Sequence, residues 1–531
     1  MADEILDVAI IGGGVSGVYS AWRLLTEGGK KNVAVFEASD EIGGRLLSVT
    51  PPHIPFMKAE LGGMRILPAV QPRITKLIDV LNKDAKPDDY IETYPFPVDQ
   101  PDNISYLRGV YLRLSDFGKT PSTVPYRLTF QEQGQTPGQL AVNAIEQIVP
   151  GITNPGLNDD QRRQLAQSSS FAGQPLYKQG FWGVLSRVMS GEAYQLALAA
   201  GGYETTLSNW NAADAIPWFL SDFGVDPEYK GFKRGFQQVP LTLEQRVKKR
   251  HGKVHCGAHV TGFEHKGGTF EIKFKNRKPA RAKALILAMP RRALELLAPA
   301  SPLLQQESVV TLIKSVTPRP LFKLFTTYLN PWWLPAGVEK GRTTTDLPVR
   351  QTYYWPKFDG EPATSGRAML MASYDDGLNI GFWDGFRTKR GIGWRPGVRA
   401  TADTEWFEGS AEETDHTRWF KYRAPRRMVR EVQRQLAIIH GLGFIPGVID
   451  ASFKDWGDDP FGGGWNSWNI GVKSQNVKEK ILKPTDAPLY ICGEAYSDAQ
   501  GWVEGALQTA DMMLEKYFDI PPLAEETGTA R

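Results

Sequence analysis

Cysteine is nearly absent from this chain of 531 residues, in which only Cys256 and Cys492 occur. Two cysteines cannot build the disulfide framework of a small secreted domain, and they suit a reducing compartment. The opening residues, MADEILDVAIIGGG, lack the basic and then apolar order of a secretory signal peptide. We therefore expect a cytoplasmic protein without disulfide bonds.

Long apolar runs and a strong net charge are also missing. No uncharged run approaches the roughly 20 residues that a membrane-spanning helix needs. The formal net charge is +3, which is too small to favour electrostatic capture of nucleic acid. The basic stretch KFKNRKPARAK is short and lies between strand-like segments, so it is better explained as a solvated hairpin. We expect neither a membrane nor a nucleic acid as a partner.

Histidine is scarce, and its one cluster does not favour a metal. His251, His255 and His259 are spaced by four residues, which would form one ligand face on a helix. Gly252 and Gly257, with Val254 between them, instead predict strand and turn. We therefore expect no metal site, and no Ser-His-Asp arrangement stands in a recognisable motif.

The segments that are present predict an α/β fold. ILDVAIIG is typical of a buried strand, VSGVYSAWRLL of a helix, and KNVAVFEA of a second strand, which together form a βαβ unit. KALILAMP in the middle and APLYICGEA near the end predict further strands, the last followed by a helix in GWVEGALQTADMMLEKYF. The pattern predicts a doubly wound, Rossmann-like dinucleotide-binding domain built from discontinuous segments.

The sequence pattern divides the chain into three predicted domains. We assign residues 1–66, 238–312 and 443–531 to the dinucleotide-binding domain. Residues 67–125 and 313–442 alternate in hydrophobicity and predict a strand-rich substrate domain. Residues 126–237 are rich in helix formers and predict a helical insert.

A glycine loop follows the first strand. Gly12 permits a tight turn, Gly14 lets the backbone approach a pyrophosphate, and Gly17 lets the helix lie close to the strand. The helix N-terminus then faces the phosphate charge. Glu37 follows Gly17 by twenty residues, at the end of the second strand, where a carboxylate accepts hydrogen bonds from ribose hydroxyls.

The identity of the dinucleotide depends on the residues that come next. Glu37 disfavours a 2′-phosphate because like charges would meet, which leaves FAD or NAD. EASDEIGGRL then places Gly43, Gly44 and Arg45 behind that carboxylate. Two glycines allow the loop to press against a cofactor, and Arg45 can neutralise the pyrophosphate. Such a clamp suits a tightly held FAD better than an exchanging nicotinamide.

Arg65 stands in an apolar setting, between Met64 and Ile66 in KAELGGMRILP. A guanidinium is always charged, and burying it is costly unless an anion meets it. The anion is either a ligand or a nearby acid such as Glu60.

Five motifs together carry a resemblance that covers nearly the whole chain. They are IGGGVSG, EASDEIGGR, LGGMRI, TTDLPVRQTYYWP and GEAYSDAQGWVEGALQTA. The sequence resembles the flavin-dependent amine oxidases, and specifically the L-amino acid oxidases. The resemblance implies a flavin domain, a substrate domain and a helical domain in a homodimer. It also implies oxidative deamination, in which hydride transfer from Cα to flavin N5 leads to a 2-oxo acid, ammonia and hydrogen peroxide.

The resemblance also assigns substrate contacts. Arg65 would grip the substrate carboxylate together with a tyrosine hydroxyl. TYYW offers Tyr353 and Tyr354, whose side chains point to opposite faces of a strand, and we expect Tyr354 to serve. Lys323 lies between apolar residues in PLFKLFTTY. It either extends to water or, as the family implies, holds a water molecule at flavin N5, and we expect the second role.

The remaining site residues are likewise implied by the resemblance. Those predicted to contact the cofactor, in addition to the residues of the glycine loop and Arg45, are Gly63, Met64, Arg65, Val260, Glu494, Gly501, Trp502 and Val503. Those predicted to border the substrate are Gly501 and Trp502. Trp465 is added because it lies in the loop GGGWNSW, where glycines let a large ring approach, although an ordinary core role is equally open. Such rings favour large apolar or aromatic side chains. Some relatives bind flavin through a cysteine, but FGGGWNSW has none, so FAD is expected to be non-covalent.

Four alternatives stay open, one of which is a monooxygenase that would give an amide. A flavin-dependent dehydrogenase would pass electrons to an acceptor other than oxygen. An oxidase of plain amines would leave Arg65 without an anion, which argues against it. A flavin-holding interaction module would have no catalytic activity.

Overall fold

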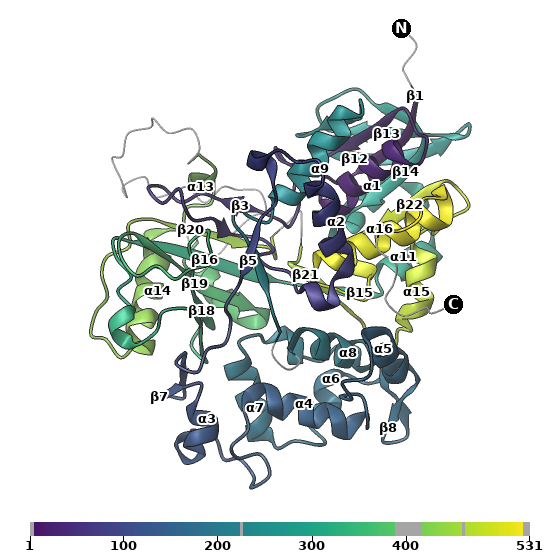
Figure 1. The fold of residues 1–531 in the computed structure, drawn as a ribbon. Coiled ribbons are helices and arrows are strands. Elements are labelled where there is room, and N and C mark those ends of the chain that lie inside the picture. Colours follow the sequence, from purple (N-terminus) through teal and green to yellow (C-terminus); the bar gives the residue numbers. More distant parts are fainter. Residues whose placement is uncertain (1–4, 224–226, 388–416, 459–461, 524–531) are drawn as a thin grey trace.

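A computed structural model describes residues 5–223, 227–387, 417–458 and 462–523 (Figure 1). Two seven-stranded sheets dominate it. The first sheet lies at the upper right of Figure 1, the second lies at the left, and a group of helices lies below them. Helices and several sheets are therefore mixed, and the predicted α/β fold class is confirmed.

The first sheet draws its strands from both ends and the middle of the chain. Its order is β11–β2–β1–β14–β13–β12, and β22 also pairs with β14. The strands are β1 (Ile5–Ile11), β2 (Val33–Phe36), β11 (Lys253–His255), β12 (Val260–Lys266), β13 (Thr269–Phe274), β14 (Ala280–Ala288) and β22 (Leu489–Cys492). β11, β2, β1, β14 and β22 run parallel to one another. β13 pairs antiparallel with β14, and β12 pairs antiparallel with β13.

Helices cover both faces of this sheet, as the apolar strands require. Val8 and Ile10 pack in one core cluster, and Ala9 and Ile11 pack in another, because neighbouring strand residues point to opposite faces. The first face is covered by α1 (Val15–Thr26), α2 (Pro72–Asn82), α9 (Gln238–Lys249) and α16 (Val503–Phe518). The second is covered by α10 (Arg291–Leu297), α11 (Glu307–Ile313) and α15 (Ser474–Ile481).

The second sheet has the order β20–β16–β19–β18–β17–β6–β7. Its strands are β6 (Ile104–Leu107), β7 (Val110–Arg113), β16 (Leu321–Tyr328), β17 (Gly341–Thr345), β18 (Gln351–Tyr354), β19 (Ala368–Asp376) and β20 (Ala451–Asp455). The amphipathic helix α14 (Arg426–Ile439) buries Val429, Val432 and Leu436 in the same core cluster as this sheet. β20 pairs with β16, so the boundary that we predict at residue 443 lies too early.

The helical group is α4 (Pro137–Ile148), α5 (Asp159–Ser168), α6 (Phe181–Leu185), α7 (Gly191–Gly201) and α8 (Ala212–Phe223). Thr136 and Asn158 begin α4 and α5 with capping boxes, which satisfy amides that the first turn leaves free. The group has a core cluster of its own that includes Phe181, Trp210 and Ile216. We therefore propose that the helical insert is a separate unit.

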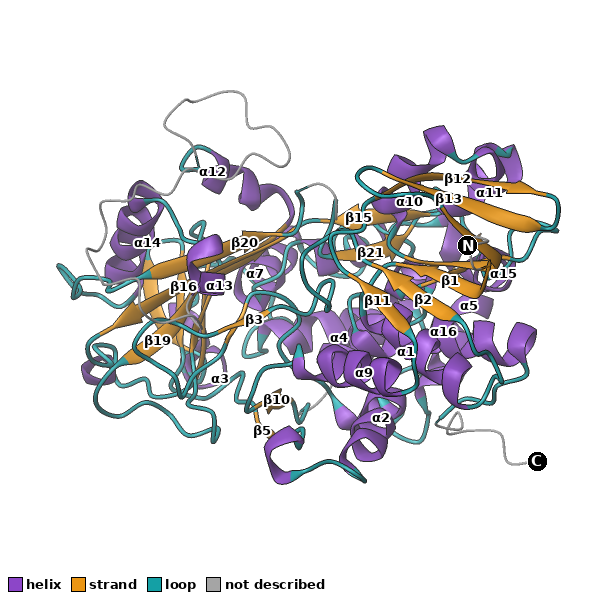
Figure 2. Ribbon diagram, turned by 90° about the horizontal axis from the view of Figure 1, so that it is seen from above, coloured by secondary structure: helices purple, strands orange, loops and turns teal. Residues whose placement is uncertain are grey.

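Shorter elements connect these layers. They are β3 (Ser48–Val49), β4 (Ala59–Glu60), β5 (Thr93–Pro95), β8 (Ser170–Phe171), β9 (Gln174–Pro175), β10 (Lys230–Phe232), β15 (Val316–Arg319), β21 (Trp465–Trp468), α3 (Asp116–Lys119), α12 (Ile380–Asp384) and α13 (Thr417–Lys421). β15 and β21 pair with each other and lie between the two large sheets in both ribbon views (Figure 2).

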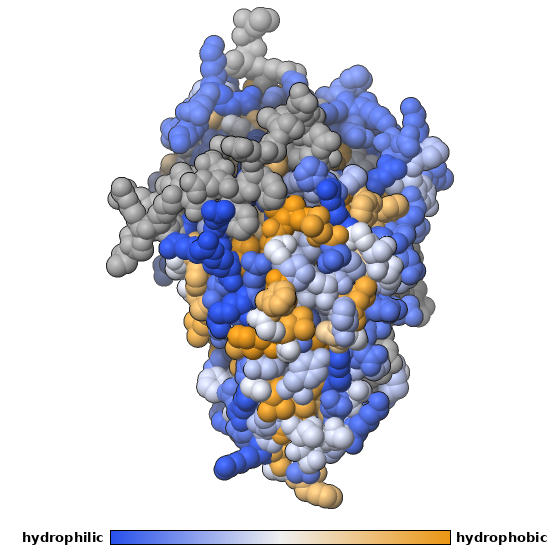
Figure 3. Space-filling model, turned by 90° about the vertical axis from the view of Figure 1, so that its left-hand side faces the viewer, coloured by the Kyte–Doolittle hydropathy of each residue, from blue (hydrophilic) through white to orange (hydrophobic). Residues whose placement is uncertain are grey.

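One face of the molecule can be followed in a space-filling view. The face on the left-hand side of Figure 1 carries apolar side chains gathered in its middle (Figure 3). Among the described residues, no helix is long and apolar enough to cross a membrane.

Candidate active site

The glycine loop after β1 is built by close backbone contacts. Gly12 has a φ of +112°, and a Cβ atom there would lie 2.3 Å from the carbonyl oxygen of Ala288. A Cβ at Gly17 would lie 2.0 Å from the carbonyl oxygen of Gly12, so glycine allows α1 to lie against the turn. Gly14 precedes the first residue of α1 and has only Gly44 near its missing Cβ, at 4.0 Å. The loop therefore leaves open space at the N-terminus of α1.

Glu37 is held in place at the end of β2. One carboxylate oxygen accepts a hydrogen bond from the amide of Gly13 at 2.7 Å, and the other accepts one from the amide of Ser39 at 2.8 Å. Oriented in this way, Glu37 still borders the cavity that the glycine loop opens. Acceptor lone pairs that these amides leave free can serve the hydroxyl groups of a ribose.

A cavity of about 480 Å³ joins almost all of the predicted site residues. The predicted residues that line it are Gly12, Gly14, Glu37, Gly44, Arg45, Gly63, Met64, Arg65, Val260, Lys323, Trp465, Glu494, Gly501, Trp502 and Val503. Gly17 stands behind the lining, as its packing role requires. Tyr354 does not line the cavity either. The binding roles of these residues remain predictions.

Arg45 and Glu494 tie three distant segments together beside this cavity. Arg45 donates to a carboxylate oxygen of Glu494 at 2.7 Å and to the carbonyl of Gly464 at 3.0 Å. Glu494 also accepts hydrogen bonds from the backbone and side-chain amides of Asn466, each at 2.9 Å, and from the amide of Gly501 at 2.7 Å. Helix α16 begins two residues after Gly501, so the positive end of its dipole borders the same cavity.

These features fit a bound FAD. The open glycine turn and the N-terminus of α1 suit a pyrophosphate, Glu37 suits a ribose, and the N-terminus of α16 suits the electron-rich edge of a flavin. Neither cysteine lines the cavity: Cys256 is exposed, and Cys492 is buried in β22. This placement agrees with a flavin held without a covalent bond.

Arg65 is a buried cation, only 5% exposed, with few partners. Its guanidinium lies 4.0 Å from the ring centre of Tyr229 and donates to the hydroxyl of Tyr353 at 3.2 Å. It forms no ion pair with any described residue. Glu60 accepts instead from the hydroxyl of Ser48 and the amide of Phe236, so the predicted alternative of an Arg65–Glu60 salt bridge is not formed.

The electric field around Arg65 favours its charged form. Burial opposes the charge, but the neighbouring tyrosines Tyr353, Tyr203 and Tyr229 and the carboxyl group of Asp222 outweigh burial and raise the pKa of Arg65 above its ordinary value. Asp222 itself is buried, accepts from the hydroxyl of Tyr229 at 3.0 Å, and has a raised pKa because of burial. The arginine is therefore cationic and has room for a further anion in the cavity.

Tyr353, rather than Tyr354, is the tyrosine beside Arg65. The hydroxyl of Tyr354 lies on the other face of β18, 2.6 Å from the hydroxyl of Thr343 and 2.7 Å from Nε2 of His440. The prediction for Tyr354 is therefore wrong. Strand alternation means that only one of the two tyrosine side chains can point to Arg65. The sequence alone does not reveal which face of the strand meets the cavity.

Lys323, on β16, is 3% exposed and does not extend to bulk water. Its ammonium group donates to the backbone carbonyls of Glu60 and Gly62. Burial lowers the pKa of Lys323 to about 7, although the charge of Glu60 opposes this shift and that of Arg65 adds to it. Burial likewise raises the pKa of Glu60 to about 7.

Aromatic rings form much of the remaining wall. Trp465 is 5% exposed and stacks on Trp218 with ring centres 5.4 Å apart. Sequence reasoning misses several lining residues, namely Tyr203, Thr206, Trp218, Asp222, Phe223, Tyr374, Asp376 and Trp456. Most of them come from the helical group or from β19, and none stands in a motif. A buried aspartate within the apolar segment FLSDF is the only signal that could have found Asp222.

A second cavity, of about 1510 Å³, meets the first at Arg65. The two share Arg65, Tyr203, Thr206, Asp222 and Phe223. Its other lining residues come from the helical group, the start of the second sheet and the segment around β10. It therefore offers a ligand a route to Arg65 between the helices and the second sheet.

Several known proteins are similar to this chain in sequence or in fold. Residues 15–388 match the family described as flavin-containing amine oxidoreductase. Aplysianin-A of Aplysia kurodai is 27% identical over 545 residues, which cover 97% of this chain and 91% of that protein. The L-amino acid oxidase Bs29 of Bothriechis schlegelii is 24% identical over 69% of this chain and 68% of its own length. Putrescine oxidase bound to putrescine has a similar fold, with a TM-score of 0.65, 16% identity, and coverage of 96% and 97%.

Proposed function

The chain belongs to the flavin-containing amine oxidoreductases and has FAD as its cofactor, and from this premise we propose that it is an L-amino acid oxidase. The proposed reaction is the oxidative deamination of L-amino acids to 2-oxo acids, ammonia and hydrogen peroxide. Relatives named L-amino acid oxidases support the class of substrate.

One observation carries the proposal: Arg65 is a buried guanidinium that borders the cavity and has no carboxylate partner among the described residues. An α-amino acid always brings a carboxylate, which a guanidinium can grip with two parallel hydrogen bonds. Tyr353, 3.2 Å from Arg65, can provide a further contact. A plain amine would leave this charge unmatched.

The other residues have complementary roles in the proposal. Trp465 and Trp502 close the pocket around the substrate and keep water from the reacting carbon. Lys323 holds a water molecule or a proton close to the reacting atoms. FAD, when bound, supplies the hydride acceptor and returns its electrons to oxygen.

The decisive test is peroxide release by the purified protein with each of the twenty L-amino acids, with D-isomers as controls. We expect activity with several L-amino acids, strongest for large apolar or aromatic side chains because rings dominate the pocket wall. Equal activity with D-isomers, or a flavin that stays oxidised anaerobically with every L-amino acid, would contradict the proposal. The second outcome would favour the flavin-holding interaction module.

Two alternative activities have their own signatures. A dehydrogenase would bleach its flavin with amino acids and consume little oxygen, and it would turn over only when a dye was supplied as the electron acceptor. An amine oxidase would prefer decarboxylated substrates over the parent amino acids.

Assembly and location stay predictions. We propose a homodimer, which the apolar area on the face in Figure 3 supports. Size-exclusion chromatography with light scattering would test it, and a monomer at micromolar concentration would contradict it. A cytoplasmic location also stays a prediction.

A further inference from the structure

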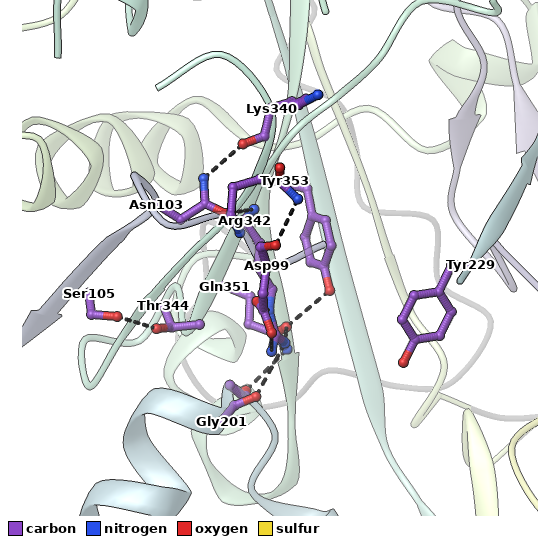
Figure 4. Close-up of polar contacts among 12 residues, drawn as sticks. Asp99, Asn103, Ser105, Gly201, Tyr229, Lys340, Arg342, Thr344, Gln351 and Tyr353 are labelled. Carbon is purple, nitrogen blue, oxygen red and sulfur yellow. Dashed lines mark hydrogen bonds and ion pairs between the residues drawn. The ribbon is translucent and has the colours of Figure 1, made fainter. Parts of the chain in front are cut away.

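From Tyr353, a chain of hydrogen bonds leads through Gln351 and Arg342 to Asp99, whose side chain is half exposed (Figure 4). Tyr353 donates its hydroxyl proton to Oε1 of Gln351 at 3.3 Å. The same oxygen accepts a hydrogen bond from Arg342 at 2.8 Å. Arg342 then forms a bidentate ion pair with Asp99, at 2.7 and 3.1 Å. We call these four residues, Tyr353, Gln351, Arg342 and Asp99, the relay.

The strand register brings the relay to one face of the second sheet. Gln351 and Tyr353 are two residues apart on β18, so their side chains point the same way. Arg342 on β17 is the direct cross-strand partner of Tyr353. Tyr354 points to the opposite face, where it contacts Thr343 and His440.

The C-terminus of α7 fixes the amide of Gln351. Gln351 donates from Nε2 to the carbonyl of Gly202 at 3.1 Å, and Arg342 donates to the carbonyl of Gly201 at 3.2 Å. Because Nε2 must face a carbonyl and Oε1 must face a guanidinium, the amide can adopt only one of its two orientations. Gly202, with a φ of +88°, has no Cβ and so leaves space for the amide, since a Cβ there would lie 2.5 Å from the side-chain carbonyl carbon of Gln351.

Gln351 therefore presents an acceptor and no donor to Tyr353. The hydroxyl of Tyr353 must give its proton to Gln351, which leaves its oxygen lone pairs to face Arg65. From this arrangement we propose that Gln351, anchored by Arg342, is a positioning residue. It sets the hydroxyl of Tyr353 and, through it, the direction in which Arg65 presents its guanidinium to a carboxylate. The inference rests on the proposed function, because it assumes that Arg65 receives that carboxylate.

A residue that only ties α7 to the sheet would affect every ligand alike, whereas a positioning residue would affect carboxylates selectively. The test therefore compares the best L-amino acid substrate with its primary amide, which lacks the anion. Benzoate and benzamide, titrated by calorimetry into the FAD-loaded protein, repeat the comparison without turnover. We expect Gln351→Leu to lower kcat/KM for the amino acid about fivefold, mainly through KM, which is the effect of losing one hydrogen bond. The value for the amide should change less than twofold, and benzoate affinity should fall about as much as kcat/KM.

A double-mutant cycle tests whether Gln351 acts through Tyr353. Tyr353→Phe removes one oxygen and should cause a similar selective loss, and adding Gln351→Leu to it should cause little further loss. Tyr354→Phe is the matched control and should leave the ratio of acid to amide unchanged. Additive losses, or equal losses for acid and amide, would overturn the proposal. If Gln351→Leu proves unstable, the comparison of Tyr353→Phe with Tyr354→Phe still tests whether the hydroxyl of Tyr353 acts selectively on carboxylates.

The result is distinguishable from a failure of the proposed function. If the unaltered protein oxidises no L-amino acid, the proposed function is wrong, and benzoate binding still tests the relay. If it oxidises amino acids and the variants keep its preference for the acid, only the relay is wrong.

Discussion

Two buried arginines border the second cavity, and they differ in their partners. Arg342 is 6% exposed in its side chain, and it has the carboxylate of Asp99, the amide oxygen of Gln351 and the carbonyl of Gly201 as acceptors. Arg65 is as deeply buried, but among the described residues it has one tyrosine hydroxyl and the faces of aromatic rings.

The difference separates a structural cation from one that awaits a ligand. A buried charge with a complete set of acceptors has already recovered part of its desolvation cost within the fold. A buried charge without such acceptors retains its desolvation cost in the folded protein. The binding of an anion can then recover free energy that folding did not recover. The number of acceptors around each guanidinium is therefore more informative than burial alone.

The strongest test of this contrast is Arg65→Ala. Losing the partner of a bound carboxylate costs roughly 2–5 kcal/mol in such sites, so kcat/KM for L-amino acids should fall about thirtyfold or more. Steady-state peroxide assays measure the loss. The melting temperature of the ligand-free protein should stay the same or rise, because an unpaired buried charge is removed. A change in kcat/KM of less than threefold would refute the role of Arg65.

The opposite result is expected for Arg342→Met. Removing the donor leaves the carbonyl of Gly201 without this partner and Oε1 of Gln351 with Tyr353 as its remaining donor, which should lower the free energy of unfolding by about 2 kcal/mol. Asp99 is half exposed and can be hydrated, which limits the loss. Thermal unfolding of the FAD-free protein would detect a drop of about 2 °C, because the entropy of unfolding grows with chain length. If Arg342→Met proved as harmless to stability as Arg65→Ala, the contrast between the two arginines would fail.

Lys323 is also a buried cation, and unlike the two arginines it can lose its charge as pH rises. Its lowered pKa of about 7 means that it is an ammonium below that pH and a neutral amine above it. A positive charge stabilises the negative charge that develops on oxygen as it is reduced, so reoxidation should slow as pH rises through about 7. Lys323→Met should slow reoxidation about tenfold at pH 6 and remove this pH dependence. Stopped-flow mixing of the reduced protein with oxygen measures the rate; if neither half-reaction slows, the role of Lys323 is wrong.

The same shift makes a prediction for stability. Because the pKa of Lys323 is lower in the folded protein than in the unfolded chain, the charged lysine weakens folding below about pH 7. This cost fades as pH rises from about 7 toward the ordinary lysine pKa. Lys323→Met should therefore melt at a higher temperature than the unaltered protein at pH 6, and the advantage should shrink at pH 10. An advantage that stayed constant with pH would show that packing, rather than charge, is its cause.

The smallest effect is expected for Asp222→Asn. Asp222 lines both cavities and places negative charge in the surroundings of Arg65, so it competes electrostatically with an incoming carboxylate. Replacing it with the neutral isostere should tighten benzoate binding about two- to threefold. Because burial raises the pKa of Asp222, calorimetry at pH 8 gives a clearer comparison than calorimetry at lower pH. Weaker benzoate binding would mean that Asp222 supports Arg65 rather than opposing it.

Local patterns carry the predictions for the cofactor side of the site, and the structure places those residues along one cavity. Gly12, Gly14 and Glu37 lie within about one βαβ unit, and their backbone requirements are visible as glycines at fixed spacing. Arg65 was also predictable, because a charged residue in an apolar stretch contradicts its surroundings. These signals need no knowledge of distant segments.

The substrate side depends on contacts that no local pattern encodes. The choice between Tyr353 and Tyr354 follows from which face of β18 meets the cavity, and that is set by the packing of the whole second sheet. Asp222 and Tyr229 come from the end of α8 and the chain that follows it, and they join Arg65 only in three dimensions. The boundary at residue 443 failed for the same reason, because β20 is an ordinary short strand until it pairs with β16.

The pairing of β14 with β22 has a consequence for biosynthesis. β1 is made long before the parallel strand β22 and helix α16, because these two elements lie much further along the chain. β14 cannot pair along this edge until β22 is present, and α1 cannot pack against α16 until α16 is present. Long-range parallel pairing of this kind is slow. A nascent chain therefore cannot complete its flavin cradle until β22 and α16 have been synthesised, however early β1 and the glycine loop emerge.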